Sequence, residues 1–97
     1  MNYQRIKTLQ EDYGYNTMQE MINSGRAWVM EGSYGRSAMR CLESGACMLP
    51  KKDHYDYYGN PVPSRDRLKK GTKGTFQNCA RFWEAVEEGS IYLDEEI

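Results

Sequence analysis

The chain has 97 residues, of which 39% are apolar and 28% are charged, and its formal net charge is −1. This length suits one domain with one small core. The composition excludes disordered, collagen-like and coiled-coil chains, and no apolar stretch approaches the roughly 18 residues of a membrane span. Because the first twenty residues contain no apolar leader segment, we expect a cytoplasmic protein.

The charges are distributed unevenly along the chain. Residues 51–74 hold seven basic and three acidic groups, a balance of +4, whereas residues 75–97 hold one basic and six acidic groups, a balance of −5. A domain that binds nucleic acid over a wide surface usually has a basic composition as a whole. Any binding of nucleic acid by this chain must therefore be local.

Two short helices are predicted at the start of the chain. Asn2 is placed to cap the first helix, and Gly14 is placed to end it in the left-handed conformation. Thr17 and Glu20 have the spacing of a capping box, which predicts the beginning of the second helix. Gly25 is the next position at which a helix would end.

A third helix is predicted to begin at Ser33 or Ser37 and to end at Gly45. Between it and the second helix, residues 27–31 are too short for an assignment by periodicity; we assign them to a helical turn, with a buried extended piece as the alternative. The inward-facing stripe of the third helix is predicted to contain Ala38, Met39, Cys41 and Leu42. The same Ser-Gly pair follows the second and third helices, which indicates that short helices stack on each other.

The middle of the chain is predicted to be an ordered irregular loop. Residues 50–64 contain all three prolines together with Gly59 and Asn60, and these residue types favour turns and extended backbone. Ser64 is placed to cap a short helix that ends near Lys70. We expect the loop to run over the surface of the domain.

The clearest helix in the sequence covers residues 76–88, with Thr75 as its cap and Gly89 after its end. Residues 91–97 alternate enough for a short C-terminal strand, but an isolated strand needs a partner and none is predicted, so we interpret them as a frayed or docking tail. The expected fold is a single compact domain over residues 1–97, mainly α-helical, with four to five short helices. One core is predicted to contain Trp83, Phe82 or Phe76, Met21, Ile22, Met39 and Leu42.

The thiols and the single imidazole are the residues best suited to metal binding or catalysis. They are Cys41, Cys47, His54 and Cys79, and their spacing lacks the close pairs of a zinc site, so we expect neither a metal nor another cofactor. Catalysis would need a thiol beside His54, and the sequence does not say whether the two meet in space. A cysteine on an apolar helix stripe usually behaves as a small hydrophobe. A small enzyme with Cys/His chemistry is therefore the third interpretation of function.

The segment KKGTKGTF, residues 69–76, has the features of an anion-binding loop. Gly71 and Gly74 free the backbone, and Thr75 begins a helix whose N–H groups favour an anion. The order of a Walker motif is missing. The alternative interpretation is a turn that caps two helices and leaves its lysines in water.

Three tyrosines lie close to this basic segment. Tyr55, Tyr57 and Tyr58 offer stacking faces for bases or anchors for a partner protein, and they would serve equally to pack the loop on the core. We favour a non-catalytic binding protein, with a nucleic-acid or nucleotide-phosphate-binding module at residues 69–75 as the alternative. The predicted contact surface comprises Tyr55, Tyr57, Tyr58, Arg65, Arg67, Lys69, Lys70 and Lys73.

The sequence HYDYYGNPVPSR, followed by GTKGT and preceded by LESGACML, resembles a set of small uncharacterised proteins encoded by bacteriophages and prophages. The resemblance covers about residues 17–76. It implies a phage accessory protein in the bacterial cytoplasm that binds a host or defence protein, and it assigns no role to any residue.

Overall fold

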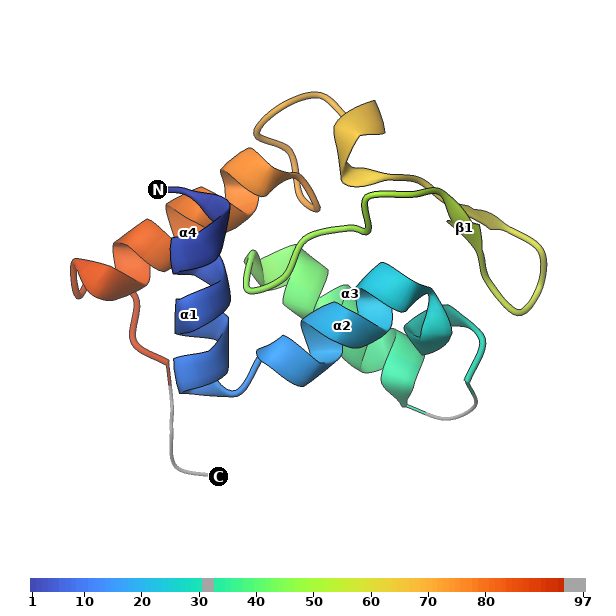
Figure 1. Ribbon diagram of the computed structural model, residues 1–97, viewed down its shortest axis with the longest axis horizontal. Helices are drawn as coiled ribbons and strands as arrows, with labels where there is room; N and C mark the ends of the chain where they lie inside the picture. Colours follow the sequence, from blue (N-terminus) through green and yellow to red (C-terminus); the bar gives the residue numbers. More distant parts are fainter. Residues whose placement is uncertain (31–32, 94–97) are drawn as a thin grey trace.

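The computed structural model describes residues 1–30 and 33–93, and within these ranges the chain forms a single, mainly α-helical domain (Figure 1). The expected fold class is confirmed. The elements are α1 (Tyr3–Tyr13), α2 (Asn16–Ser24), the 3-10 helix η1 (Arg26–Trp28), α3 (Tyr34–Ser44), β1 (His54–Tyr55), β2 (Pro61–Val62), the 3-10 helix η2 (Arg65–Arg67) and α4 (Phe76–Glu87). Helix α1 packs against α4, and α2 packs against α3.

Most predicted helix ends are confirmed, because they depend on local signals. The Asn2 side chain accepts a hydrogen bond from Arg5 N at 2.8 Å, and Gly14 adopts the left-handed conformation with φ 83°. The capping box at the start of α2 is wrong, since α2 begins at Asn16 and Tyr15 precedes it without a side-chain cap. The helical turn predicted for residues 27–31 is a 3-10 helix that ends at Trp28, and residue 31 lies outside the described residues.

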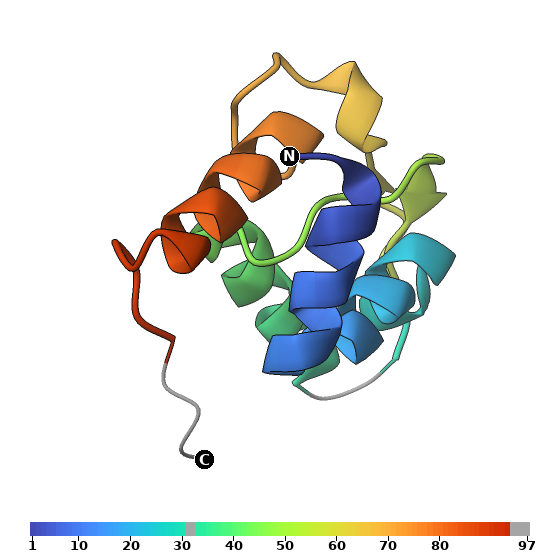
Figure 2. The ribbon, with the colours of Figure 1, turned by 60° about the vertical axis from the view of Figure 1, so that its left-hand side comes forward.

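The segment that follows α3 runs through the interior, and it passes behind α1 in the view of Figure 2. Residues 45–50 are all buried. Successive side chains of residues 46–49 pack on two different sides of the segment. Ala46 and Met48 pack with α1 and α4, whereas Cys47 and Leu49 pack with α2 and α3.

The interior therefore consists of two apolar clusters on either side of this segment, and the prediction of one shared core is wrong. Trp83 and Phe82 belong to the α1–α4 cluster, whereas Ile22 and Leu42 belong to the α2–α3 cluster. The inward position predicted for Met39 is also wrong, since half of its side chain is exposed (50%).

Buried side chains satisfy the backbone polar groups of the interior segment. Gln19 Oε1 accepts from Met48 N, and Gln19 Nε2 donates to Met48 O, both at 2.9 Å. Ala46 O accepts from Gln10 Nε2 at 2.9 Å and from Trp83 Nε1 at 3.0 Å. Buried backbone groups without partners are costly, so these side chains make the course of the segment possible.

The loop over residues 50–64 contains a short antiparallel hairpin that was not predicted. His54 pairs with Val62 and Tyr55 pairs with Pro61. Of the C-terminal segment, residues 91–93 are not in a strand, Ile91 and Leu93 pack against the α1–α4 cluster, and residues 94–97 lie outside the described residues.

Candidate functional site

The tip of the hairpin is ordered by the carboxylate of Asp56. Its Oδ1 accepts from Tyr58 N at 2.9 Å and from Asn60 N at 2.8 Å, and its Oδ2 accepts from Asn60 Nδ2 at 3.3 Å. Gly59 takes the left-handed conformation (φ 84°) that this turn needs. Sequence reasoning missed the role of Asp56, although an aspartate that begins a tight turn is a recognisable local signal.

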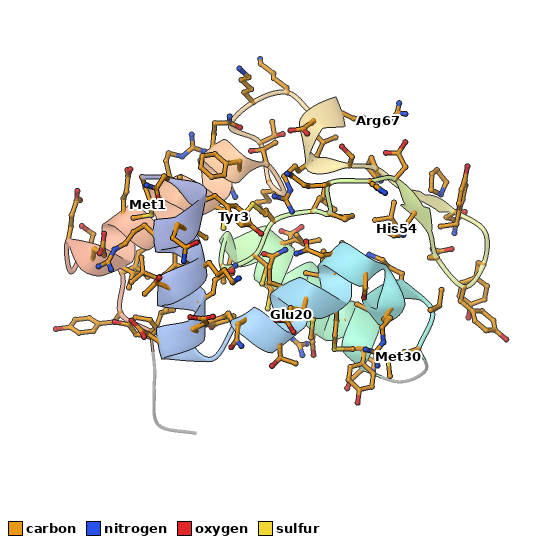
Figure 3. The ribbon with its side chains drawn as sticks, in the orientation of Figure 1. Met1, Tyr3, Glu20, Met30, His54 and Arg67 are labelled. Atoms are coloured by element: carbon orange, nitrogen blue, oxygen red, sulfur yellow. The ribbon has the colours of Figure 1, made fainter. Side chains whose placement is uncertain are left out.

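The three tyrosines of the predicted contact surface are exposed on this hairpin. The exposed fractions are 66% for Tyr55, 71% for Tyr57 and 84% for Tyr58. Tyr57 N donates to Trp28 O at 3.0 Å, which fixes the tip against η1. The rings of Tyr57 and Tyr58 meet edge to face, with their centres 5.3 Å apart. In Figure 3, side chains project outward from the hairpin, and Met30 lies on the same side of the molecule.

A cleft of about 350 Å³ lies between α3 and the hairpin. We call it the α3–hairpin cleft. Its apolar lining includes Trp28, Met39, Leu42, Leu49, Val62 and Pro63. A shallower surface continues from it past Trp28 and Met39 to Arg36, Arg40 and the two tip tyrosines. This cleft could not be predicted from the sequence, since its walls come from segments that are far apart along the chain.

The charged groups of the described residues around the cleft leave an excess of positive charge. Lys73 Nζ lies 2.6 Å from Glu43 Oε1, so these two charges offset each other. The Asp56 carboxylate is occupied by the hairpin tip. Arg36 and Arg40 are exposed, and neither forms an ion pair with any residue in 1–30 or 33–93.

Arg65 does not belong to the contact surface, and its prediction there is wrong. Only 6% of the residue is exposed. Its Nε donates to Leu49 O at 2.6 Å and its Nη2 donates to Asn23 Oδ1 at 3.1 Å. The guanidinium carbon also lies 5.8 Å from the ring centre of Tyr3. Arg65 therefore stabilises the interior, and a partner does not reach it.

The other predicted cations are on the surface. Arg67 pairs with Asp53 at 2.7 Å, and Lys69 and Lys70 are exposed. The Ser64 N–H, which donates to Asp53 Oδ1 at 2.8 Å, and the Arg67 guanidinium together lower the pKa of Asp53. Arg67 is thus partly neutralised, whereas the two lysines lie in no ion pair with the described residues.

The groups predicted to bind an anion cap and pack α4 instead. Thr75 is 1% exposed, and its hydroxyl accepts from Asn78 N and Gly71 N, both at 3.2 Å, and donates to Thr72 O at 2.6 Å. A Cβ at Gly74 would lie 2.7 Å from a carbon of the Leu49 side chain, so packing excludes larger residues there. The Gly71 amide and the Thr75 hydroxyl are therefore occupied, which favours the capping-turn interpretation of residues 69–75.

The thiols and the imidazole lie in different places. His54 Nε2 lies 3.2 Å from Asn23 O, and the ring packs over Gly25. The pKa of Cys47 is raised mainly by a hydrogen bond with Cys41 and to a smaller extent by burial. Burial also raises the pKa of Cys79, to about 12. Among the described residues, no hydrogen bond joins His54 to a thiol, and no three His, Cys, Asp or Glu side chains are arranged to hold a metal ion.

Comparison with protein-family models, with curated proteins and with solved structures finds no match to this chain. Within residues 1–30 and 33–93, no helix is long and apolar enough to cross a membrane.

Proposed function

We propose that this is a non-catalytic binding protein, which contacts a partner protein through the tyrosines of the hairpin tip and the surface beside them. The observation that carries the proposal is the exposure of Tyr57 and Tyr58 on a tip that the Asp56 carboxylate holds in place. Tyrosine, tryptophan, methionine and arginine are enriched at protein interfaces, and all four types meet here. Because the tip is already ordered, binding costs it little conformational entropy.

The resemblance to bacteriophage and prophage proteins supports a particular setting for this activity. We propose an accessory protein that acts in the bacterial cytoplasm on a host or defence protein. Such a protein needs a firm contact surface and no catalytic group.

The alternative is a nucleic-acid or nucleotide-phosphate-binding module. It is favoured by the exposed Lys69 and Lys70, which lie in no ion pair with the described residues. It is disfavoured by Thr75 and Lys73, whose polar groups are occupied within the domain. We therefore rank protein binding first.

Affinity capture from a bacterial host lysate, with and without nuclease, tests the proposal. We expect a protein partner that nuclease does not release. The double variant Tyr57→Ala, Tyr58→Ala should lose most of it, because interface tyrosines often dominate binding energy. The double variant Lys69→Ala, Lys70→Ala is the matched control and should retain it. Loss of the partner on nuclease treatment, or with the lysine variant alone, would favour the nucleic-acid alternative.

A further inference from the structure

The α3–hairpin cleft has the size and lining of a site for a large apolar side chain. Its volume of about 350 Å³ lies within the range of ligand-holding clefts, roughly 300–1,000 Å³. Met39 lies at the edge of the cleft, and half of this apolar side chain is exposed to water. Exposed apolar surface of this kind beside a concave wall often marks an interaction site.

One wall of the cleft is formed by Trp28. The indole Nε1 of Trp28 is buried and has no acceptor among the described residues. The other tryptophan, Trp83, donates its Nε1 to Ala46 O at 3.0 Å. Buried donors are nearly always paired in folded proteins, so the Trp28 N–H is an exception. Because the Nε1 atom itself has no exposed surface, Trp28 contributes to the cleft as an apolar wall and serves as a reporter of its occupation.

The charged side chains at the rim of the cleft indicate the sign of the charge on the partner. Of the described acids that line the cleft, Glu43 is paired with Lys73, whereas Asp56 keeps its negative charge although the hairpin amides hold its oxygens, so the two arginines of α3 leave one positive charge in excess. Arg36 and Arg40 lie on the exposed side of α3, next to the tip tyrosines. Arginines at the edge of an interface attract carboxylates and steer their approach.

We propose that the α3–hairpin cleft binds an acidic peptide segment of the partner protein, which places one large apolar side chain in the cleft and its carboxylates on Arg36 and Arg40. The inference rests on the proposed function, and it names the chemistry of the partner. A peptide suits this surface better than single-stranded nucleic acid, which needs a track of cations along its backbone. The walls here are apolar, and only two arginines at the rim are without an ion pair among the described residues.

Selection from a random peptide display library, with depletion on a Met39→Asp variant, provides the probe. Met39 is exposed, so this substitution should leave the circular dichroism spectrum unchanged. We expect enriched peptides to carry one large aliphatic or aromatic residue flanked by Asp or Glu. A basic consensus, a consensus without an apolar residue, or no enrichment would overturn the proposal.

Titration of the ¹⁵N-labelled protein with the enriched peptide then locates the site. We expect the indole resonance of Trp28 to shift while that of Trp83 stays in place as an internal control. Arg36→Glu with Arg40→Glu should weaken binding by about tenfold or more, whereas Lys69→Glu with Lys70→Glu, the same change of charge elsewhere, should have a smaller effect. Equal weakening by both pairs would show a general charge effect and overturn the site.

Two further controls are needed. The first distinguishes an acidic peptide from other occupants of the cleft, and the second distinguishes failure of this inference from failure of the proposed function. A shift of the Trp28 resonance with a DNA oligonucleotide and not with the peptide, or with protein concentration alone, would assign the cleft to nucleic acid or to a second copy of the chain. If the lysate partner is lost with Tyr57→Ala, Tyr58→Ala but retained with Met39→Asp, the proposed function stands and the cleft inference falls. If the peptide binds as expected and the lysate yields no protein partner, the reverse holds.

Discussion

The substitution Gln19→Leu removes a side chain that holds the interior segment by hydrogen bonds. Leucine keeps most of the volume of glutamine, so the change removes the polar contacts with little loss of packing. It removes the one side-chain partner that Met48 N and Met48 O have among the described residues, and Met48 is fully buried. Gln10 loses one acceptor but keeps Ala46 O.

The magnitude follows from these two backbone groups. Each buried polar group left without a partner costs about 1–3 kcal/mol, so we expect the free energy of unfolding to fall by about 2–6 kcal/mol. A domain of this length has a total stability of about 5–15 kcal/mol. The variant should therefore be marginally folded. Urea unfolding followed by circular dichroism measures the difference, with the exposed Gln4→Leu as the matched control and an expected change within about 0.5 kcal/mol.

A small effect would refute this reasoning. If Gln19→Leu lowers the unfolding free energy by less than about 1 kcal/mol with an unchanged dependence on urea, the Met48 backbone has found other partners or water. The polar side chains would then fill the interior without fixing the course of the segment.

Three further predictions concern the hairpin, the thiols and the basic loop. Asp56→Ala should speed amide hydrogen exchange at the hairpin tip and weaken partner binding by about tenfold, while the urea midpoint changes little. Burial raises the pKa of Cys79 to about 12, and Cys41 is the partly exposed thiol. Near pH 8, one thiol per folded chain should therefore react quickly with an aromatic disulfide reagent, and all three thiols should react after denaturation. Rapid reaction of two thiols in the folded state would contradict this. Gly74→Ala should destabilise the fold more than Gly89→Ala in urea unfolding, because both glycines are left-handed but only the Cβ at Gly74 would meet another side chain, at 2.7 Å; equal losses would show that backbone strain alone decides.

The helix ends could be predicted from the sequence because caps are local. Asn2 and Thr75 each accept a hydrogen bond from the N–H three residues later, and Gly14 and Gly45 end their helices in the left-handed conformation. These contacts lie within a few residues of each other along the chain. The residue types alone therefore indicate them.

The role of Arg65 could not be predicted in this way. Arginine is mostly exposed in folded proteins, and nothing next to Arg65 in the sequence indicates otherwise. Its acceptors are Leu49 O and Asn23 Oδ1, which lie 16 and 42 residues away along the chain. Met39 shows the opposite case, since helical spacing placed it with Leu42 on the inward stripe. The hairpin stands off from this part of α3, and the gap between them is the cleft.

Only part of the candidate site could be predicted from the sequence. The tyrosines were recognised by their type and their crowding, whereas Trp28, Arg36 and Arg40 were not, because they reach the same surface from other segments. Asp56 was the exception among the missed residues, since its turn is local. Contact surfaces built from distant segments require the tertiary fold, whatever the strength of the local signals.

The interior segment, residues 45–50, joins the core to the cleft, and this link explains what residues 65–74 contribute to the candidate site. Leu49 packs in the α2–α3 cluster and also lines the cleft. Its N donates to Gly74 O at 2.9 Å, and its O accepts from Arg65 Nε at 2.6 Å, so both of its backbone polar groups are held by residues of the basic part of the chain. Because Leu49 is held in place, the part of the cleft wall that it forms is already ordered before a partner binds, which lowers the entropic cost of binding. Residues 65–74 therefore act on the site mainly through Arg65 and Gly74, which hold Leu49 in place, and in the binding mode that we propose the charge that meets an acidic partner comes from Arg36 and Arg40 on α3.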